Sequence, residues 1–76
     1  MARVKTPTNI ALGRAVRETR KARGHTQESF ALKAGLDRSY YGAIERGEFN
    51  VTVETLSKVA AGLEVAAWEL LERAGL

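Results

Sequence analysis

The sequence predicts an all-α protein that folds as one compact domain of five helices. Apolar residues recur at helical spacing in five segments, and no segment gives a convincing strand pattern. N-capping side chains and glycines mark where these segments begin and end. With 76 residues, the chain can bury one modest core but has little room for a lidded catalytic cleft.

The first predicted helix ends at about Ala22. Pro7 and Thr8 lead into it, and Gly24 stops it. Its inward stripe is weak and consists of Ile10, Leu12, Ala15, Val16 and Thr19. Residues 1–8 are basic, and we expect them to form a flexible segment ahead of a single domain at 9–76.

The second and third predicted helices are short and joined by a tight turn. Thr26 is a good N-cap, and Gln27 opens the second helix. Gly35 ends it, because glycine takes a positive φ without a Cβ clash. Leu36 adds an apolar residue at the corner, and Asp37 caps the third helix.

The two faces of these helices differ in chemistry. Their inward sides are predicted to carry Phe30, Ala31, Ala34, Tyr41, Ile44 and Glu45. The outward side of the third helix is small, polar and cationic, with Ser39, Gly42, Ala43 and Arg46 flanked by Arg38 and Tyr40. Short side chains let a helix sit deep in a major groove while arginine reaches guanine edges. The sequence therefore predicts a DNA-binding face.

The fourth and fifth predicted helices complete the core. Thr52 caps the fourth, whose apolar stripe is Val53, Leu56, Val59, Ala60 and Leu63. The last helix, about Ala66 to Ala74, carries Trp68, Leu70 and Leu71 on a segment too short to bury them all. These three residues are expected to form a dimerisation surface, although Trp68 could instead be a buried core anchor.

The charge is unevenly distributed along the chain. Residues 1–46 hold ten Lys or Arg against four Asp or Glu, whereas residues 47–76 hold two against five. This is the footprint expected of a phosphate-binding face, although charge bias alone is more typical of a solvated surface. The basic half coincides with the two short helices, which favours DNA as the partner.

Several classes of function have no support in the sequence. The chain has no Cys, no membrane-length apolar run and no apolar signal-peptide core, so we expect a cytoplasmic protein without disulfides or a membrane partner. It lacks a catalytic Ser, His and Asp set, metal-ligand spacing and a phosphate-binding glycine loop. We therefore expect no enzyme activity, catalytic residue, cofactor or metal.

A family resemblance rests on motifs spread over roughly residues 10–72. Arg20, Gly24-His25-Thr26-Gln27, Ala31, Gly35-Leu36 and Ile44-Glu45-Arg46-Gly47 resemble the helix-turn-helix (XRE) family of phage Cro proteins and repressors. The run Gly35 to Tyr40, with Asn50, is similar to controller proteins of restriction-modification systems. The resemblance implies a lambda-repressor-like domain and a homodimeric transcriptional regulator that binds a near-palindromic operator.

The resemblance also implies roles for individual residues. The implied DNA-binding residues are Thr26, Gln27, Arg38, Ser39, Tyr40, Ala43 and Arg46. Among them, Gln27 would bond a phosphate, Arg38 and Ser39 would face base edges, and Ala43 would offer a methyl group to thymine. Tyr40 and Arg46 would contact the DNA backbone or groove walls. Arg20 and Glu45 would form a structural ion pair, and Tyr41 would be a core residue with its hydroxyl at the surface.

Two alternatives for the whole protein stay open at this stage. The same fold could hold a protein partner through its last two helices, as an interaction module or an antitoxin. As a regulator, the protein would have DNA, a second copy of itself and, as a further candidate, RNA polymerase as partners. Phe49 is expected to pack under its loop or at a subunit boundary rather than to contact DNA.

Overall fold

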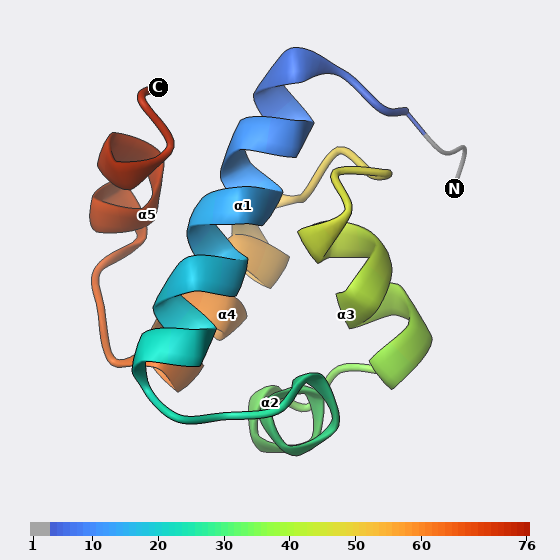
Figure 1. Ribbon diagram of the computed structural model, residues 1–76, viewed down its shortest axis with the longest axis vertical. Coiled ribbons are helices and arrows are strands. Elements are labelled where there is room, and N and C mark those ends of the chain that lie inside the picture. The colour runs from blue at the N-terminus through green and yellow to red at the C-terminus, as the bar shows by residue number, and fades with distance from the viewer. Residues whose placement is uncertain (1–3) are drawn as a thin grey trace.

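The computed structural model describes residues 4–76 as an all-α domain (Figure 1). Its five helices are α1 (Pro7–Ala22), α2 (Gln27–Ala34), α3 (Arg38–Glu45), α4 (Val53–Leu63) and α5 (Ala67–Arg73). No strand occurs within residues 4–76, so the predicted fold class is confirmed. Helix α1 begins at Pro7, and the boundary expected after residue 8 therefore falls inside it. Residues 1–3 of the expected flexible segment lie outside the described residues.

Short polar side chains start four of the five helices. The caps Thr6, Thr26, Asp37 and Thr52 each accept a hydrogen bond from the backbone N–H three residues later. Before α5 the arrangement differs, because Ala66 has no capping oxygen and its backbone N–H instead donates to Glu69 Oε1 at 3.0 Å. These local bonds explain why the helix starts could be predicted from sequence.

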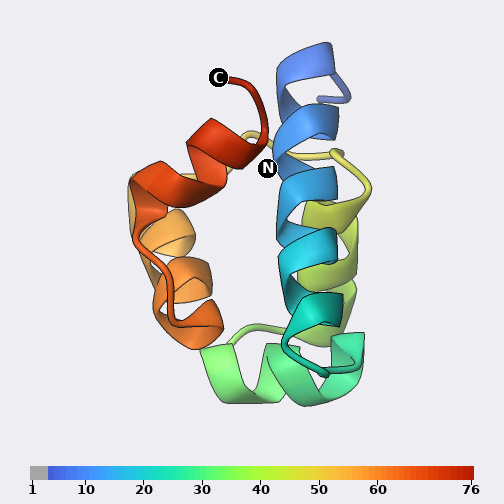
Figure 2. The same cartoon turned by 60° about the vertical axis from the view of Figure 1, so that its left-hand side comes forward.

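The helices pack in two pairs, which contact each other where α1 meets α5 and which α2 also links. Figure 2 shows α1 beside α3 on one side of the molecule, α4 with α5 on the other, and α2 across one end. The buried apolar core between them consists of Leu12, Val16, Phe30, Ala31, Tyr41, Val59, Ala60, Leu63 and Leu70. Helix α2 contributes to both halves, since it packs against α3 and against α4.

Two residues predicted to face inward are exposed. Val53 is 81% exposed because it is the first residue of α4, directly after its cap. Ile10 lies near the start of α1, where its neighbour is the backbone of Gly47 rather than the apolar core. None of the helices in residues 4–76 has the length and apolar character needed to cross a bilayer.

Candidate nucleic-acid interface

Beneath the predicted DNA-binding face, the carboxylate of Glu45 accepts four hydrogen bonds that link α1, α2 and α3. Glu45 Oε2 accepts from Arg20 Nε at 2.7 Å and from the Tyr41 hydroxyl. Glu45 Oε1 accepts from Arg20 Nη2 at 3.1 Å and from Gln27 Nε2 at 2.8 Å. The Arg20 and Glu45 side chains are only 8% and 2% exposed. The structure thus brings Arg20 and Glu45 together as a buried ion pair.

The contacts within this cluster, which consists of Arg20, Gln27, Tyr41 and Glu45, determine the protonation states of its members. Burial raises the pKa of Glu45, but hydrogen bonds from Arg20, Tyr41 and Gln27 outweigh burial, so its pKa lies below the ordinary value. The hydrogen bond to Glu45 raises the pKa of Arg20. Burial, followed by the bond to Glu45, raises the pKa of Tyr41. Around neutral pH the cluster therefore holds one cation, one anion and a neutral phenol.

Tyr41 lies deeper than the sequence predicted. It is fully buried, and its ring centroid is 5.0 Å from that of Phe30. Its hydroxyl donates to Glu45 one helical turn later on α3, so the expectation that the hydroxyl reaches the surface is wrong. The larger side chain is accommodated because its one polar atom has a buried acceptor.

The turn between α2 and α3 sets the orientation of α3. Gly35 ends α2 with φ 72°, a conformation that most side chains disfavour. The Leu36 N–H donates back to Ala31 O at 2.9 Å, and Asp37 caps α3. This rigid corner leaves Arg38 and Ser39 exposed at the start of α3.

The start of α2 lies beside α3. Thr26 is exposed, and Gln27 is half-buried. One N–H of the Gln27 amide donates to Glu45, so the buried cluster restrains the side chain predicted to bond a phosphate. The first backbone N–H groups of α2 have no partner within the helix and carry the positive end of its dipole.

Fewer side chains are exposed on the outward face of α3 than the sequence predicted. Ala43 is only 2% exposed, so the expectation that it offers a methyl group to thymine is wrong. The chain turns back after α3, and the Glu48 N–H donates to Ala43 O at 3.0 Å. Tyr40 and Phe49 are both half-buried, and their ring centroids lie 5.5 Å apart, so Phe49 packs against α3.

Carboxylates accompany the cations of this face. Arg46 Nε lies 2.8 Å from Glu48 Oε2, and the hydrogen bond to Glu48 raises the pKa of Arg46. Arg38 Nε is 3.9 Å from Glu28 Oε2 in a looser, exposed pair. The sequence gives no signal for the first contact beyond the acidic character of Glu48 beside the motif.

Val4 and Asn9 are tied to the loop after α3, a link that sequence reasoning missed. Asn9 Nδ2 donates to Val4 O at 2.6 Å and to Asn50 Oδ1 at 2.8 Å, and Asn9 is buried. The Val4 N–H donates to Glu48 O. The polar character of Asn9 on a predicted helix was the available signal, because a buried amide needs such partners.

The predicted dimerisation residues do not share one surface. Trp68 is 63% exposed, which excludes the alternative of a buried core anchor, and Leu71 is half-buried. Leu70 is fully buried in the core, so its assignment to a dimer surface is wrong. Consecutive positions of a helix lie 100° apart, which turns Leu70 inward while Trp68 points out.

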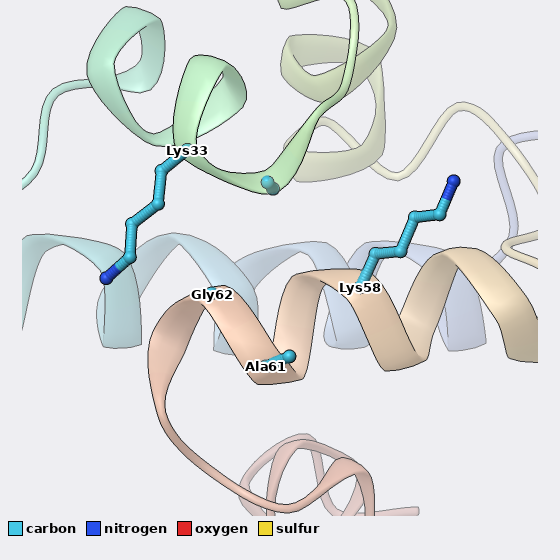
Figure 3. A pocket seen from close by; sticks show the side chains of 5 residues that line it. Lys33, Lys58, Ala61 and Gly62 are labelled. Carbon is cyan, nitrogen blue, oxygen red and sulfur yellow. The ribbon is translucent and has the colours of Figure 1, made fainter.

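An open groove lies between α2 and α4. Its volume is about 340 Å³, and it is lined by Lys33, Ala34, Lys58, Ala61 and Gly62 (Figure 3). The lining offers two lysines but no carboxylate, imidazole or hydroxyl. Within residues 4–76, moreover, no three His, Cys, Asp or Glu side chains gather as metal ligands would.

Known proteins resemble this chain in sequence and in fold. The helix-turn-helix family profile matches residues 16–67. Control protein C.MunI of Mycoplasma sp is 42% identical over 62 residues, which cover 80% of this chain and 84% of that protein. The crystal structure of the restriction-modification controller protein C.AhdI from Aeromonas hydrophila is 43% identical, with a TM-score of 0.78 over 80% of this chain and 92% of that chain.

A further similar structure contains nucleic acid. The crystal structure of SinR, a master regulator for biofilm formation, in complex with DNA is 36% identical, with a TM-score of 0.75 over 79% of this chain and 97% of that chain. Some relatives are longer than this chain. The chain spans 46% of a hypothetical transcription factor from Neisseria meningitidis, with 45% identity over 49 residues.

Proposed function

The chain belongs to the helix-turn-helix family, and we propose that it is a sequence-specific transcriptional regulator that binds operator DNA as a homodimer. The observation that carries this proposal is the exposed start of α3, where Arg38 and Ser39 project from a helix fixed by the buried cluster. A rigid helix with exposed polar side chains is what direct reading of base edges requires.

The proposed contacts are of two kinds: contacts with the DNA backbone position the protein, and contacts with base edges read the sequence. Thr26 and Gln27 would bind phosphate at the start of α2, where the positive end of the helix dipole favours an anion. Tyr40 would contact the DNA backbone beside them. Arg38 and Ser39 would meet base edges in the major groove, with Arg38 suited to guanine.

The proposed dimer uses the exposed residues of α5. Trp68 and the half-buried Leu71 form its centre, and tryptophan is enriched in protein interfaces. Two-fold symmetry then predicts two half-sites whose centres lie about 34 Å, or roughly one helical turn, apart.

The finer biological role follows two relatives that this chain covers over most of their length. C.MunI and C.AhdI are restriction-modification control proteins, and we propose the same role here. Such a regulator would act in the cytoplasm without catalysis, and activation would add RNA polymerase as a partner.

Selection of bound duplexes from a random DNA pool tests this proposal. We expect enrichment of a near-palindrome with half-sites about one turn apart. Recovery of only salt-sensitive, sequence-independent binding would refute the operator-binding function and favour a module or antitoxin that holds a protein partner.

Arg38→Ala and Gln27→Ala are expected to weaken DNA binding in different ways. Loss of Arg38 should cost about 1–3 kcal/mol and relax the preference at one base position per half-site. Loss of Gln27 should weaken binding to all duplexes more evenly, because phosphate contacts carry no sequence information. Titration of both variants against single-base operator variants measures this. Equal losses on every duplex for both variants would contradict the division.

Thermal unfolding of the same two variants is the necessary control. Arg38 is exposed, so its removal should leave stability unchanged within about 0.5 kcal/mol. Gln27 also donates to Glu45, so its removal should cost about 1 kcal/mol of stability as well. Binding should therefore be compared well below both unfolding temperatures.

A further inference from the structure

The carboxylate of Glu48 lies against Arg46, one of the cations of the proposed DNA-binding face, and is less exposed than Arg46. The Glu48 side chain is 17% exposed, whereas the Arg46 side chain is 52% exposed. The backbone of Glu48 is fixed at both ends, since its N–H donates to Ala43 O and its carbonyl accepts from the Val4 N–H. The acid is thus a fixed feature of the surface that holds a longer, more exposed partner.

The contact determines where the guanidinium group of Arg46 lies. Glu48 Oε2 accepts from Nε at 2.8 Å, and Glu48 Oε1 accepts from Nη2 at 3.4 Å. The remaining nitrogen, Nη1, lies over Gly42, because a Cβ built at Gly42 would be 3.2 Å from it and 3.6 Å from Gln27 Oε1. The guanidinium therefore folds back along α3 between Glu48 and Gln27.

The pairing alters how Arg46 responds to different acceptors on DNA. A lone guanidinium is attracted to every phosphate, whereas a paired one is nearly neutral at a distance and its carboxylate repels phosphate. Guanine presents two uncharged acceptors, O6 and N7, which an arginine nitrogen can bind without displacing a carboxylate. We place Arg46 at the groove wall in the operator complex, so the pair should suppress attraction to phosphate more than attraction to the base edges there.

Building on the proposed function, we propose that Glu48 is a specificity-determining residue of this protein. By holding Arg46, it lowers the affinity for nonspecific DNA more than the affinity for the operator. Glu48 acts as a positioning residue through Arg46 and does not itself touch DNA. Its effect is a larger ratio of operator to nonspecific affinity.

Glu48→Gln tests the inference, because glutamine keeps the size and an acceptor oxygen but removes the charge. Affinities are measured by fluorescence anisotropy on the selected operator and on a scrambled duplex over a range of salt concentrations. We expect about a 3- to 10-fold gain on the scrambled duplex, with a salt slope steeper by about 0.9 per protomer. Operator affinity should change by less than about two-fold, so the specificity ratio falls.

Glu18→Gln is the matched control. Glu18 is an exposed carboxylate five residues after Gly13, and Gly13 is the position at which α1 touches the end of α3. Five residues turn a helix by about 140° beyond a full turn, which points Glu18 away from α3. This variant makes the same change in net charge and should leave the specificity ratio as in the wild type. Glu48→Asp, which keeps the charge, should retain most of the ratio.

A double-mutant cycle with Arg46→Met separates pairing from simple charge repulsion. If Glu48 acts by holding Arg46, adding Glu48→Gln to Arg46→Met should leave the specificity ratio unchanged. The same gain in nonspecific affinity in both backgrounds would overturn the inference, as would equal gains on both duplexes or none. These results would leave the proposed function intact, whereas failure of the wild type to enrich any operator would refute the function itself.

Discussion

Replacing Glu45 by alanine is expected to destabilise the fold by about 3–5 kcal/mol, because it removes one partner of a buried ion pair. Arg20, which is 8% exposed, would then keep its charge without a counterion. The Tyr41 hydroxyl and one N–H of Gln27 would lose their acceptor as well. Domains are typically stable by about 5–15 kcal/mol, so the loss is a large fraction of the total. Urea unfolding followed by circular dichroism measures it.

The pH dependence of this loss of stability separates the contribution of the Glu45 charge from the contribution of side-chain packing. The pKa of Glu45 in the folded protein lies below the ordinary value, so its contribution is complete above that value and disappears as the pH falls through the folded pKa. The cost of Glu45→Ala should therefore be smaller at pH 2 than at pH 7. An equal cost at both values would show that the ion pair contributes nothing and that packing alone is lost.

Tyr41→Phe is the matched control for the cluster. It removes one of the four donors to Glu45 but keeps the ring against Phe30. We expect a cost of about 1 kcal/mol, well below that of Glu45→Ala, because Arg20 and Gln27 still satisfy the carboxylate.

Gly13→Ala is expected to destabilise the fold by about 3 kcal/mol, at the upper end of the range for overpacking. A Cβ at Gly13 would lie 2.6 Å from Glu45 O and 2.9 Å from Glu45 C, and closer still to Ile44 O. These are backbone atoms at the end of α3, so no side-chain rotation relieves the clash. Helices α1 and α3 would have to separate, which would strain the Arg20–Glu45 bonds. Thermal and urea unfolding of the variant measure this cost.

Gly42→Ala provides the comparison within a helix. A Cβ there would meet only side-chain atoms, the guanidinium of Arg46 at 3.2 Å and the amide of Gln27 at 3.6 Å, and no backbone atom. Alanine normally stabilises a helix interior by about 0.5–1 kcal/mol over glycine, so Gly42→Ala should be neutral or stabilising. A stabilising Gly13→Ala would contradict the close contact between α1 and the end of α3.

Local signals explain what the sequence predicted well. The helix starts were marked by Thr26, Asp37 and Thr52, and the end of α2 was marked by Gly35, because caps and positive φ involve only neighbouring residues. The longer apolar stripe of α4 placed Val59 and Leu63 in the core correctly. Each of these features depends on few residues, so a single chain suffices to predict it.

What sequence reasoning missed depends on contacts between distant segments. The seven residues of α5 make two turns, too few to fix its rotation, so Leu70 was assigned to the surface together with Trp68. Ala43 was expected to be exposed because the return of the chain over α3 has no local signal. Gly13 offered an unused clue, since a glycine inside a helix is costly and often marks a close approach of backbones.

Helix α5 carries two opposed surfaces on a very short segment. Leu70 fixes it to the core, and Arg73 Nη1 donates to Thr19 Oγ1 on α1 at 2.9 Å, while Trp68 faces outward. In the proposed dimer, subunits could pair only while α5 is docked on its own core. Docking of α5 on its own core and association of the subunits would then be linked equilibria. Binding of one subunit would therefore stabilise the docked α5 of its partner. The same linkage would lower the apparent affinity between subunits by the fraction of chains in which α5 is detached.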